Sequence, residues 1–188
     1  MSALIFGLLL FLGMHSISIV APAWRDRMAT QLGLAWRGLY SVLSLLGFIL
    51  IIRGYAAARL TPEVLYVPPG WMRHVSMTLL LPVFPLLLAA YLPGRIKTTL
   101  KHPMLVATKL WALAHLLSNG MLADVLLFGG FLLWAVADRI SLKRRPVREL
   151  KTAPASIYND WLAVIAGLSL YGLTVLWAHG KLIGMALL

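Results

Sequence analysis

Two histidines, His15 and His102, have the residue type and the setting best suited to chemistry in this chain. His15 lies in an uncharged apolar run, LIFGLLLFLGMHSISIV, and His102 lies in KHPML, where a basic segment turns apolar. An ionisable side chain at membrane depth is costly and usually faces a protein interior or a cavity. Imidazole is also a common ligand of iron and of haem. The two residues therefore favour a haem iron site, provided that their rings approach each other.

The composition indicates an integral membrane protein. The chain has 188 residues, of which 61% are hydrophobic and 12% charged, and its mean hydropathy is +0.86. A soluble domain has roughly 25% charged residues. Because there is no cysteine, disulfides, thiolate ligation of haem and iron–sulfur sites are excluded. The net charge of +11 lies in short segments between apolar runs, which favours contact with anionic lipid over binding of nucleic acid.

The apolar runs predict an all-α fold, a polytopic membrane bundle of six transmembrane helices in one domain over residues 1–188. The first run lacks the basic segment and the small-residue cleavage site of a signal peptide, so we expect it to be retained. A span needs roughly 20 residues. Pro82 and Pro85 lie inside the third run and should kink it. The expected spans are residues 2–20, 40–52 with apolar extensions on both sides, 71–92, 103–118, 121–137 and 161–178.

Lysine and arginine predict the orientation, because connections on the cytoplasmic side carry an excess of both. Twelve of them fall in the first, third and fifth connections, and four fall on the opposite side. We therefore expect the odd-numbered connections in the cytoplasm and both termini on the other side. The twelve are Arg25, Arg27, Arg37, Arg95, Lys97, Lys101, Arg139, Lys143, Arg144, Arg145, Arg148 and Lys151, and the four are Arg53, Arg59, Arg73 and Lys181.

Helix geometry limits which histidines can share one iron. His102 is expected at the cytoplasmic boundary, and His15 about 8–10 Å inside it at a rise of about 1.5 Å per residue. A six-coordinate haem needs two ligand nitrogens about 4 Å apart, twice a metal–imidazole bond of about 2 Å. His15 and His102 can meet this with a modest helix tilt. His115 lies roughly 20 Å beyond His102 on the same helix, so those two cannot ligate one iron, and His115 is a third candidate ligand.

Lys109 adds a buried cation to the same region. It follows His102 by seven residues, and therefore returns to nearly the same helical face about 10 Å deeper. A buried ammonium needs an anion. Within the chain the candidates are Asp124 and Asp138, and outside it a haem propionate or a substrate acid. Lys109 is therefore a candidate cofactor-binding residue.

Each candidate residue also has a structural alternative. His15 could hydrogen-bond to a neighbouring helix without any ligand, and His102 could cap a helix at the level of the lipid headgroups. Lys109 could bridge to Asp124 or extend to the interface, and His115 could serve packing or a hydrogen bond. His74 and His179 are expected at the outer interface.

Five sequence blocks together resemble the bacterial NnrU family, over about residues 1–145. NnrU proteins are polytopic membrane proteins named for an association with nitrite and nitric oxide reductase expression in denitrifying bacteria. Several independent blocks in one order make the resemblance specific. The blocks are LLLFLGMHS, WRGLYS, YLPGRIKTTLKHPML, LWALAHLLSNG and LLFGGFLLWAVADRISLKRR.

The same domain resembles the plant cis-zeta-carotene isomerase, a membrane haem b enzyme. The resemblance implies a bacterial inner-membrane protein with haem b (iron) as cofactor and His15 and His102 as axial ligands. Loss of one histidine ligand on redox change would open a site for nitric oxide, or for a polyene or other lipid-soluble substrate. The protein would then be a redox protein, a sensor or a haem-dependent isomerase. The cysteine implicated in ligand change in the isomerase has no counterpart here.

Two other functions fit parts of the sequence. His102-Pro103 after basic residues also resembles the RHP motif of membrane methyltransferases, whose histidine helps to hold S-adenosylmethionine. Those enzymes have a late acidic motif, whereas the late acids here, Glu149 and Asp160, stand in no matching context. The third reading is a non-catalytic assembly or regulatory factor. Haem absorption, S-adenosylmethionine binding and recovered partner proteins would distinguish the three.

Overall fold

The computed structural model describes residues 1–146, 148 and 151–183, and within these ranges its regular elements are all helices apart from one isolated β-bridge, Val64 to Met121. The described chain forms two compact units. Unit 1 comprises Met1–Val67 and Asn119–Pro146, and unit 2 comprises Pro68–Ser118 with the described part of 147–188. The helices are α1 (Ser2–Val20), α2 (Pro22–Leu32), α3 (Leu34–Ala58), α4 (Met72–Leu80), α5 (Val83–Ala89), α6 (Arg95–Leu100), α7 (Pro103–Ser118), α8 (Leu122–Ser141), α9 (Asn159–Leu173), the π-helical turn η1 (Thr174–Ala178) and α10 (His179–Ile183).

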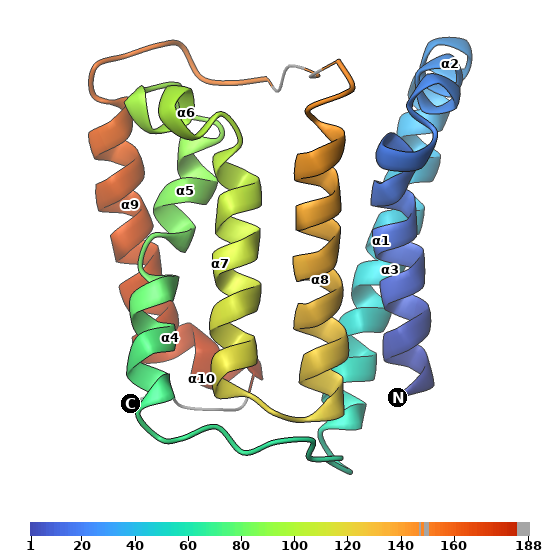
Figure 1. Ribbon diagram of the computed structural model, residues 1–188. Coiled ribbons are helices and arrows are strands. Elements are labelled where there is room, and N and C mark those ends of the chain that lie inside the picture. Colours follow the sequence, from blue (N-terminus) through green and yellow to red (C-terminus); the bar gives the residue numbers. More distant parts are fainter. Residues whose placement is uncertain (147, 149–150, 184–188) are drawn as a thin grey trace. The chain divides into compact units, whose positions relative to one another are not determined.

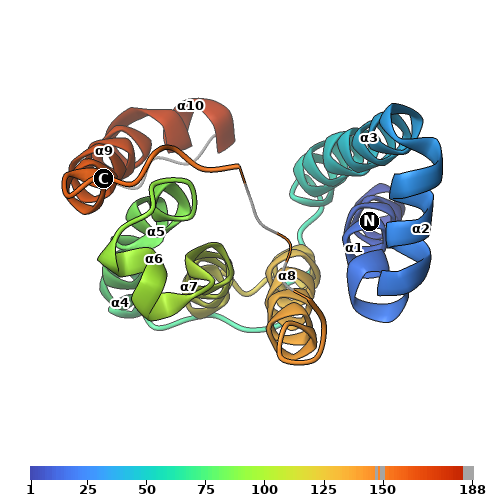
Figure 2. The same ribbon diagram turned by 90° about the horizontal axis from the view of Figure 1, so that it is seen from above.

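In unit 1, glycines let α1 and α3 pack backbone to backbone. A Cβ on Gly7 would lie 2.7 Å from the nitrogen of Ile51, and one on Gly47 would lie 2.8 Å from the nitrogen of Phe11. Residues later in α1 meet residues earlier in α3, so the two helices are antiparallel (Figure 1), and Figure 2 shows them side by side. Small residues at such interfaces permit the close approach that stabilises helix pairs in membranes.

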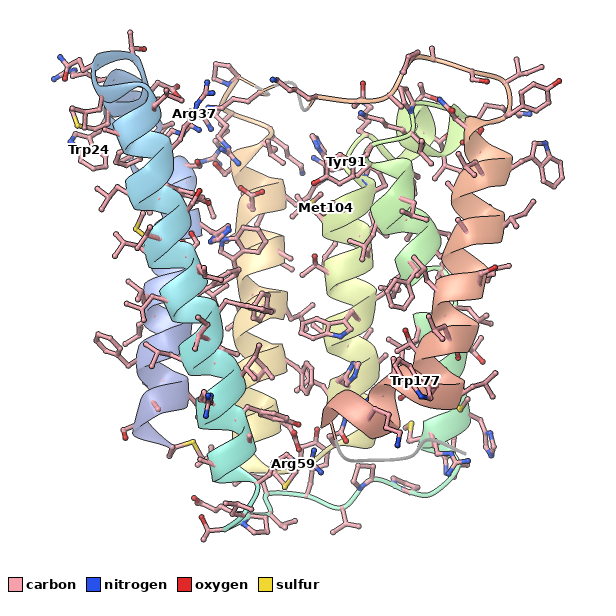
Figure 3. All side chains as sticks on the ribbon, turned by 180° about the vertical axis from the view of Figure 1, so that it is seen from behind. Trp24, Arg37, Arg59, Tyr91, Met104 and Trp177 are labelled. Atoms are coloured by element: carbon pink, nitrogen blue, oxygen red, sulfur yellow. The ribbon has the colours of Figure 1, made fainter. Side chains whose placement is uncertain are left out.

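The basic segment WRDRM, in the first connection, lies within the helix α2. Pro22 occupies its first turn, where the missing N–H costs nothing, and Gly33 has φ 50° between α2 and α3. Trp24 lies edge-on to Trp36 with centroids 5.5 Å apart. Figure 3 shows Trp24 and Arg37 at one end of unit 1 and Arg59 at the other. The aromatic and cationic residues therefore mark the two ends of α3.

The connection that follows α3 is fastened to the turn before α8. Leu65 and Tyr66 both donate backbone N–H groups to the Gly120 carbonyl, at 2.8 and 3.2 Å, and the Tyr66 hydroxyl donates to the Asn119 carbonyl. Burial and then the charge of Asp124 raise the pKa of Tyr66 above its ordinary value, so its phenol remains a donor into more alkaline solution. The end of α3 and the beginning of α8 consequently lie at the same end of unit 1.

In unit 2, α4 and α5 form one apolar segment broken at Pro82, as the sequence predicts. Both contact α7, and α5 also packs on α9, where a Cβ on Gly167 would lie 2.6 Å from Cα of Pro85. Val83, Leu86 and Ala107 are the buried centre of this packing. Figure 2 shows α4, α5, α7 and α9 grouped in this way.

Serine hydroxyls join α4 to α7. Ser76 Oγ donates to the Ala114 carbonyl at 2.7 Å and lies 2.8 Å from Ser118 Oγ, which can donate to it. Ser76 is only 3% exposed, so its hydroxyl needs these partners. Buried hydroxyls that hydrogen-bond across helices are a recurrent device in membrane bundles.

Four helical segments are long and apolar enough to cross a membrane: Ser2–Val20, Leu34–Ala58, Met72–Ala89 and Asn159–Lys181. α7 is apolar but has 16 residues, and α8 has 20 residues but carries Asp124, Asp138 and Arg139. The all-helical class is therefore confirmed, whereas four of the six expected spans are supported by length and composition. Along α3, side chains such as Val42 and Leu45 are 63% and 58% exposed, as suits a helix facing lipid.

Candidate functional site

The ring of His15 is held in one tautomer by the helix that carries it. Its Nδ1 lies 2.7 Å from the carbonyl oxygen of Phe11, one turn earlier on α1. A carbonyl can only accept, so Nδ1 must carry the proton, and in the neutral ring Nε2 carries the lone pair. A hydrogen bond from the other ring nitrogen is the usual way in which proteins orient a ligating histidine. The local geometry of His15 therefore suits metal ligation through Nε2.

Aromatic rings from three helices surround His15 in unit 1. The ring of Phe11 stacks on it at a centroid distance of 4.3 Å, Tyr40 of α3 lies at 5.4 Å, and Trp134 of α8 lies edge-on at 6.0 Å. His15 itself is half-buried. A half-buried imidazole among apolar aromatic side chains has the chemistry of an axial haem ligand, so the residue types present fit that group on the His15 side.

Trp134 leaves a polar atom unused beside this histidine. Its Nε1 is buried and has no hydrogen-bond partner in the part of the chain that the structure describes. A buried indole N–H usually finds an acceptor, and an unsatisfied one costs about 1–3 kcal/mol. Neither Trp134 nor Tyr40 was predicted from the sequence as a site residue. The only signal was spacing, since Phe131 and Trp134 lie three apart and face α1 together.

His102 occupies the position before α7 and follows a strained turn. Its backbone N–H donates to the Leu100 carbonyl at 2.7 Å, which closes a three-residue γ-turn around Lys101. Lys101 has φ 61° and ψ −43°, a conformation that costs a residue with a Cβ about 1–3 kcal/mol and that tends to occur at functional sites. Pro103 then begins the helix, as predicted. The backbone therefore fixes the position of His102 at the junction between the basic connection and α7.

His115 repeats the arrangement of His15 on α7. Its Nδ1 lies 2.8 Å from the carbonyl of Trp111, one turn earlier, and the two rings are 5.4 Å apart. The same argument assigns the proton to Nδ1. His115 stays the third candidate ligand as a prediction.

Lys109 is half-buried on α7, and the acids proposed as its partners are engaged elsewhere. Asp124 accepts the Tyr55 hydroxyl at 2.6 Å and the Met121 backbone N–H at 3.0 Å. Asp138 is paired with Arg145. These contacts lie within unit 1, whereas Lys109 belongs to unit 2. Which anion meets Lys109, one of these acids or one from outside the chain, stays a prediction.

The structure brings some of the predicted site residues together and separates others by unit. His102, Lys109 and His115 lie on or next to α7 in unit 2, and Figure 3 shows Met104, in the first turn of α7, at the same end of that unit as Tyr91. His15 lies in unit 1. The approach of His15 to His102 stays a prediction. Over the described residues no three histidine or acidic side chains gather as a metal site, and the predicted haem site needs only two histidines.

Comparison with known proteins identifies a family. A family model described as NnrU protein matches residues 3–187. No curated protein and no solved structure matches the chain. The match confirms the resemblance seen in the sequence blocks and extends it through the last apolar helix. The chain therefore belongs to the NnrU protein family.

Proposed function

We propose that this NnrU-family chain is a haem b-binding membrane protein in which His15 and His102 supply the axial ligands. The observation that carries the proposal is the ring of His15, whose Nδ1 donates to Phe11 and whose Nε2 is left for a ligand among aromatic side chains. The strained turn before His102 supports the second ligand, because it fixes the position of that residue. Such a site would suit sensing of nitric oxide, electron transfer or isomerisation of a polyene.

The residues of the chain have distinct tasks in this proposal. Phe11 fixes the tautomer and the plane of His15 through its carbonyl and its ring. Tyr40 and Trp134 pack around the same ring and would limit the access of water to it. Lys109 offers a cation for a carboxylate of the cofactor. When bound, haem would supply a redox-active iron, and the family association with nitrite and nitric oxide metabolism makes a diatomic ligand the first to test.

All six apolar segments are proposed to cross the bacterial inner membrane. The contact between the connection after α3 and the turn before α8 supports this, because α3 ends at the same end of unit 1 at which α8 begins. If α3 crosses outward, α7 must then also cross to reach that turn, and α8 must return. The charges of α8 fall near its two ends, so its centre, residues 125–137, is uncharged.

Absorption spectra of the purified protein, recorded while its redox potential is titrated in the presence of haem b, test the proposal. We expect a haem spectrum with two nitrogenous axial ligands in at least one oxidation state. Binding of S-adenosylmethionine without any haem absorption would overturn the proposal in favour of the methyltransferase alternative. A featureless spectrum together with recovered partner proteins would favour an assembly factor.

A further inference from the structure

Unit 1 contains a cleft of about 420 Å³ where α1 ends, α2 begins and α8 ends. One wall is apolar and the other carries a hydroxyl and two guanidinium groups. Since α1 is long and apolar enough to cross a membrane, its last turn lies where hydrocarbon meets headgroups. The lining residues are Ile19, Pro22, Ala137, Ile140, Ser141, Arg144 and Arg145.

Arg145, which lines this cleft, has a hydrogen-bond donor without an acceptor among the described residues. Its Nη2 donates to Asp138 Oδ1, while its Nε is buried and has no acceptor among the residues that the structure describes. The side chain is only 11% exposed. A buried donor without an acceptor points to an ion or molecule that completes it. The spare Nε–H of Arg145 therefore marks a place for an acceptor oxygen.

The charge of the cleft favours an anion. Asp138 neutralises Arg145, but Arg144 beside it is exposed and has no ion pair in the described part of the chain. Guanidinium groups bind phosphate oxygens through paired N–H donors. The apolar wall of Ile19, Ala137 and Ile140 gives no binding energy to a free phosphate ion, but it suits an acyl chain.

We propose that this cleft binds an anionic phospholipid, with the phosphate on Arg144 and the Nε–H of Arg145 and the first part of an acyl chain along Ile19, Ala137 and Ile140. The site is independent of the haem proposal, because it lies in one unit and uses none of the histidines. Basic pockets between helices on the cytoplasmic side are a known chemical solution for anionic headgroups.

The test counts lipids retained by the full-length protein in native mass spectrometry after purification from vesicles of equal phosphatidylglycerol and phosphatidylcholine. Arg144→Gln removes one headgroup contact and keeps the Arg145–Asp138 pair, and Ala137→Trp fills the apolar wall without changing any charge. Lys143→Gln is the matched control, because Lys143 is exposed, neighbours Arg144 in sequence and does not line the cleft. We expect Arg144→Gln to lower phosphatidylglycerol retention by about fivefold, the factor for about 1 kcal/mol per arginine.

The proposal further requires that Ala137→Trp lower retention and that Lys143→Gln leave it unchanged, with elution and helicity equal to wild type. Equal losses for Arg144→Gln and Lys143→Gln would overturn it, because they would show a diffuse field and no site. Equal retention of phosphatidylcholine would show an apolar groove without anion selectivity. Competition by inorganic phosphate as effective as that by phosphatidylglycerol would assign the site to a soluble anion.

Discussion

At the scale of single residues, the histidines differ in how the backbone positions them. The rings of His15 and His115 are both held by the carbonyl one turn earlier, whereas His102 is placed by a strained turn. Local structure therefore fixes the position of all three histidines. Helix geometry allows only one of His102 and His115 to ligate the same iron as His15. The basic connection before α7 favours His102, since both it and the end of α1 that carries His15 are expected on the cytoplasmic side.

Replacement of the two axial candidates should abolish haem binding. His15→Ala and His102→Ala should each remove or sharply weaken it, because a site with two imidazole ligands loses half of its axial support with either change. His115→Ala is the control and should keep haem content near that of wild type. Haem content per protein, from absorption spectra of the purified variants, is the measurement. Full loading of a His15→Ala, His102→Ala double variant would contradict the assignment and transfer ligation to His115, His74 or His179.

The variant Lys109→Met should show whether the anion that pairs with Lys109 belongs to the chain or to a bound molecule. Asp124 is already bound by Tyr55 and the Met121 N–H, so we expect the thermal midpoint of the protein without haem to change little. Haem retention should fall if the ammonium meets a propionate, while the iron ligands and the shape of the spectrum persist. A lower thermal midpoint with unchanged retention would instead assign Lys109 to a structural ion pair.

The strain at Lys101 can be measured by removing its Cβ. Lys101→Gly should raise the free energy of unfolding by about 1 kcal/mol, because glycine adopts positive φ without the cost paid by other residues. Lys101→Ala removes the same charge and keeps the Cβ, so it should give no gain. Thermal midpoints in one detergent compare the two variants. If both variants shift the midpoint equally, charge and not backbone strain is responsible.

At the scale of helices, the closest packing in unit 1 depends on glycine. A Cβ on Gly54 would collide with the backbone of Leu4, at 2.6 Å from its Cα, so Gly54→Ala should lower the free energy of unfolding by about 1–3 kcal/mol. Gly38 is on the same helix with nothing within 4 Å of its Cβ position, and Gly38→Ala should raise it by about 0.5–1 kcal/mol. Denaturation followed by circular dichroism tests the opposite signs. A loss of stability in both variants would show that helix propensity was misjudged.

Hydropathy predicted the long helices well because a spanning helix must be apolar over its whole length. The first run ends at Val20 and the fourth begins at Pro103, as expected, and the third breaks at Pro82. The helices α2 and α6 were missed, because both are short, polar and basic. α6 is stabilised instead by a distant carboxylate, since Asp160 accepts the backbone N–H groups of Arg95 and Ile96. No local sequence pattern predicts a contact between residues so far apart in the chain.

The candidate site was predictable only in part, and the reason is again physical. A histidine in an apolar run is visible in the sequence, so His15 was found. Its companions Tyr40 and Trp134 come from α3 and α8, and aromatic residues in apolar helices are too common to indicate a site by themselves. The pairing of Asp138 with Arg145 across the end of α8 was hidden for the same reason, since several arginines of that connection could have met the carboxylate.

At the scale of the whole chain, membrane topology distinguishes six spans from four. Both arrangements place a reporter fused after Arg145 in the cytoplasm and one fused after Leu188 on the other side, so those fusions test orientation alone. The six-span and four-span arrangements differ in the side of the membrane on which the turn between α7 and α8 lies. It lies outside if α7 and α8 cross, and inside if they do not. Its contacts with Leu65 and Tyr66 favour the outer side, where the connection after α3 is expected.

Because the chain has no cysteine, single cysteines labelled in intact cells by a membrane-impermeant maleimide can locate that turn. Asn119→Cys should be labelled from outside, as should Val67→Cys, which is 84% exposed in the connection after α3. Lys143→Cys should react only after the cells are opened. The Tyr66 bond to Asn119 uses the backbone carbonyl, so the substitution leaves it in place. Protection of Asn119→Cys with labelling of Val67→Cys would reduce the bundle to four spans, and α7 with His102, Lys109 and His115 would then lie outside the membrane core.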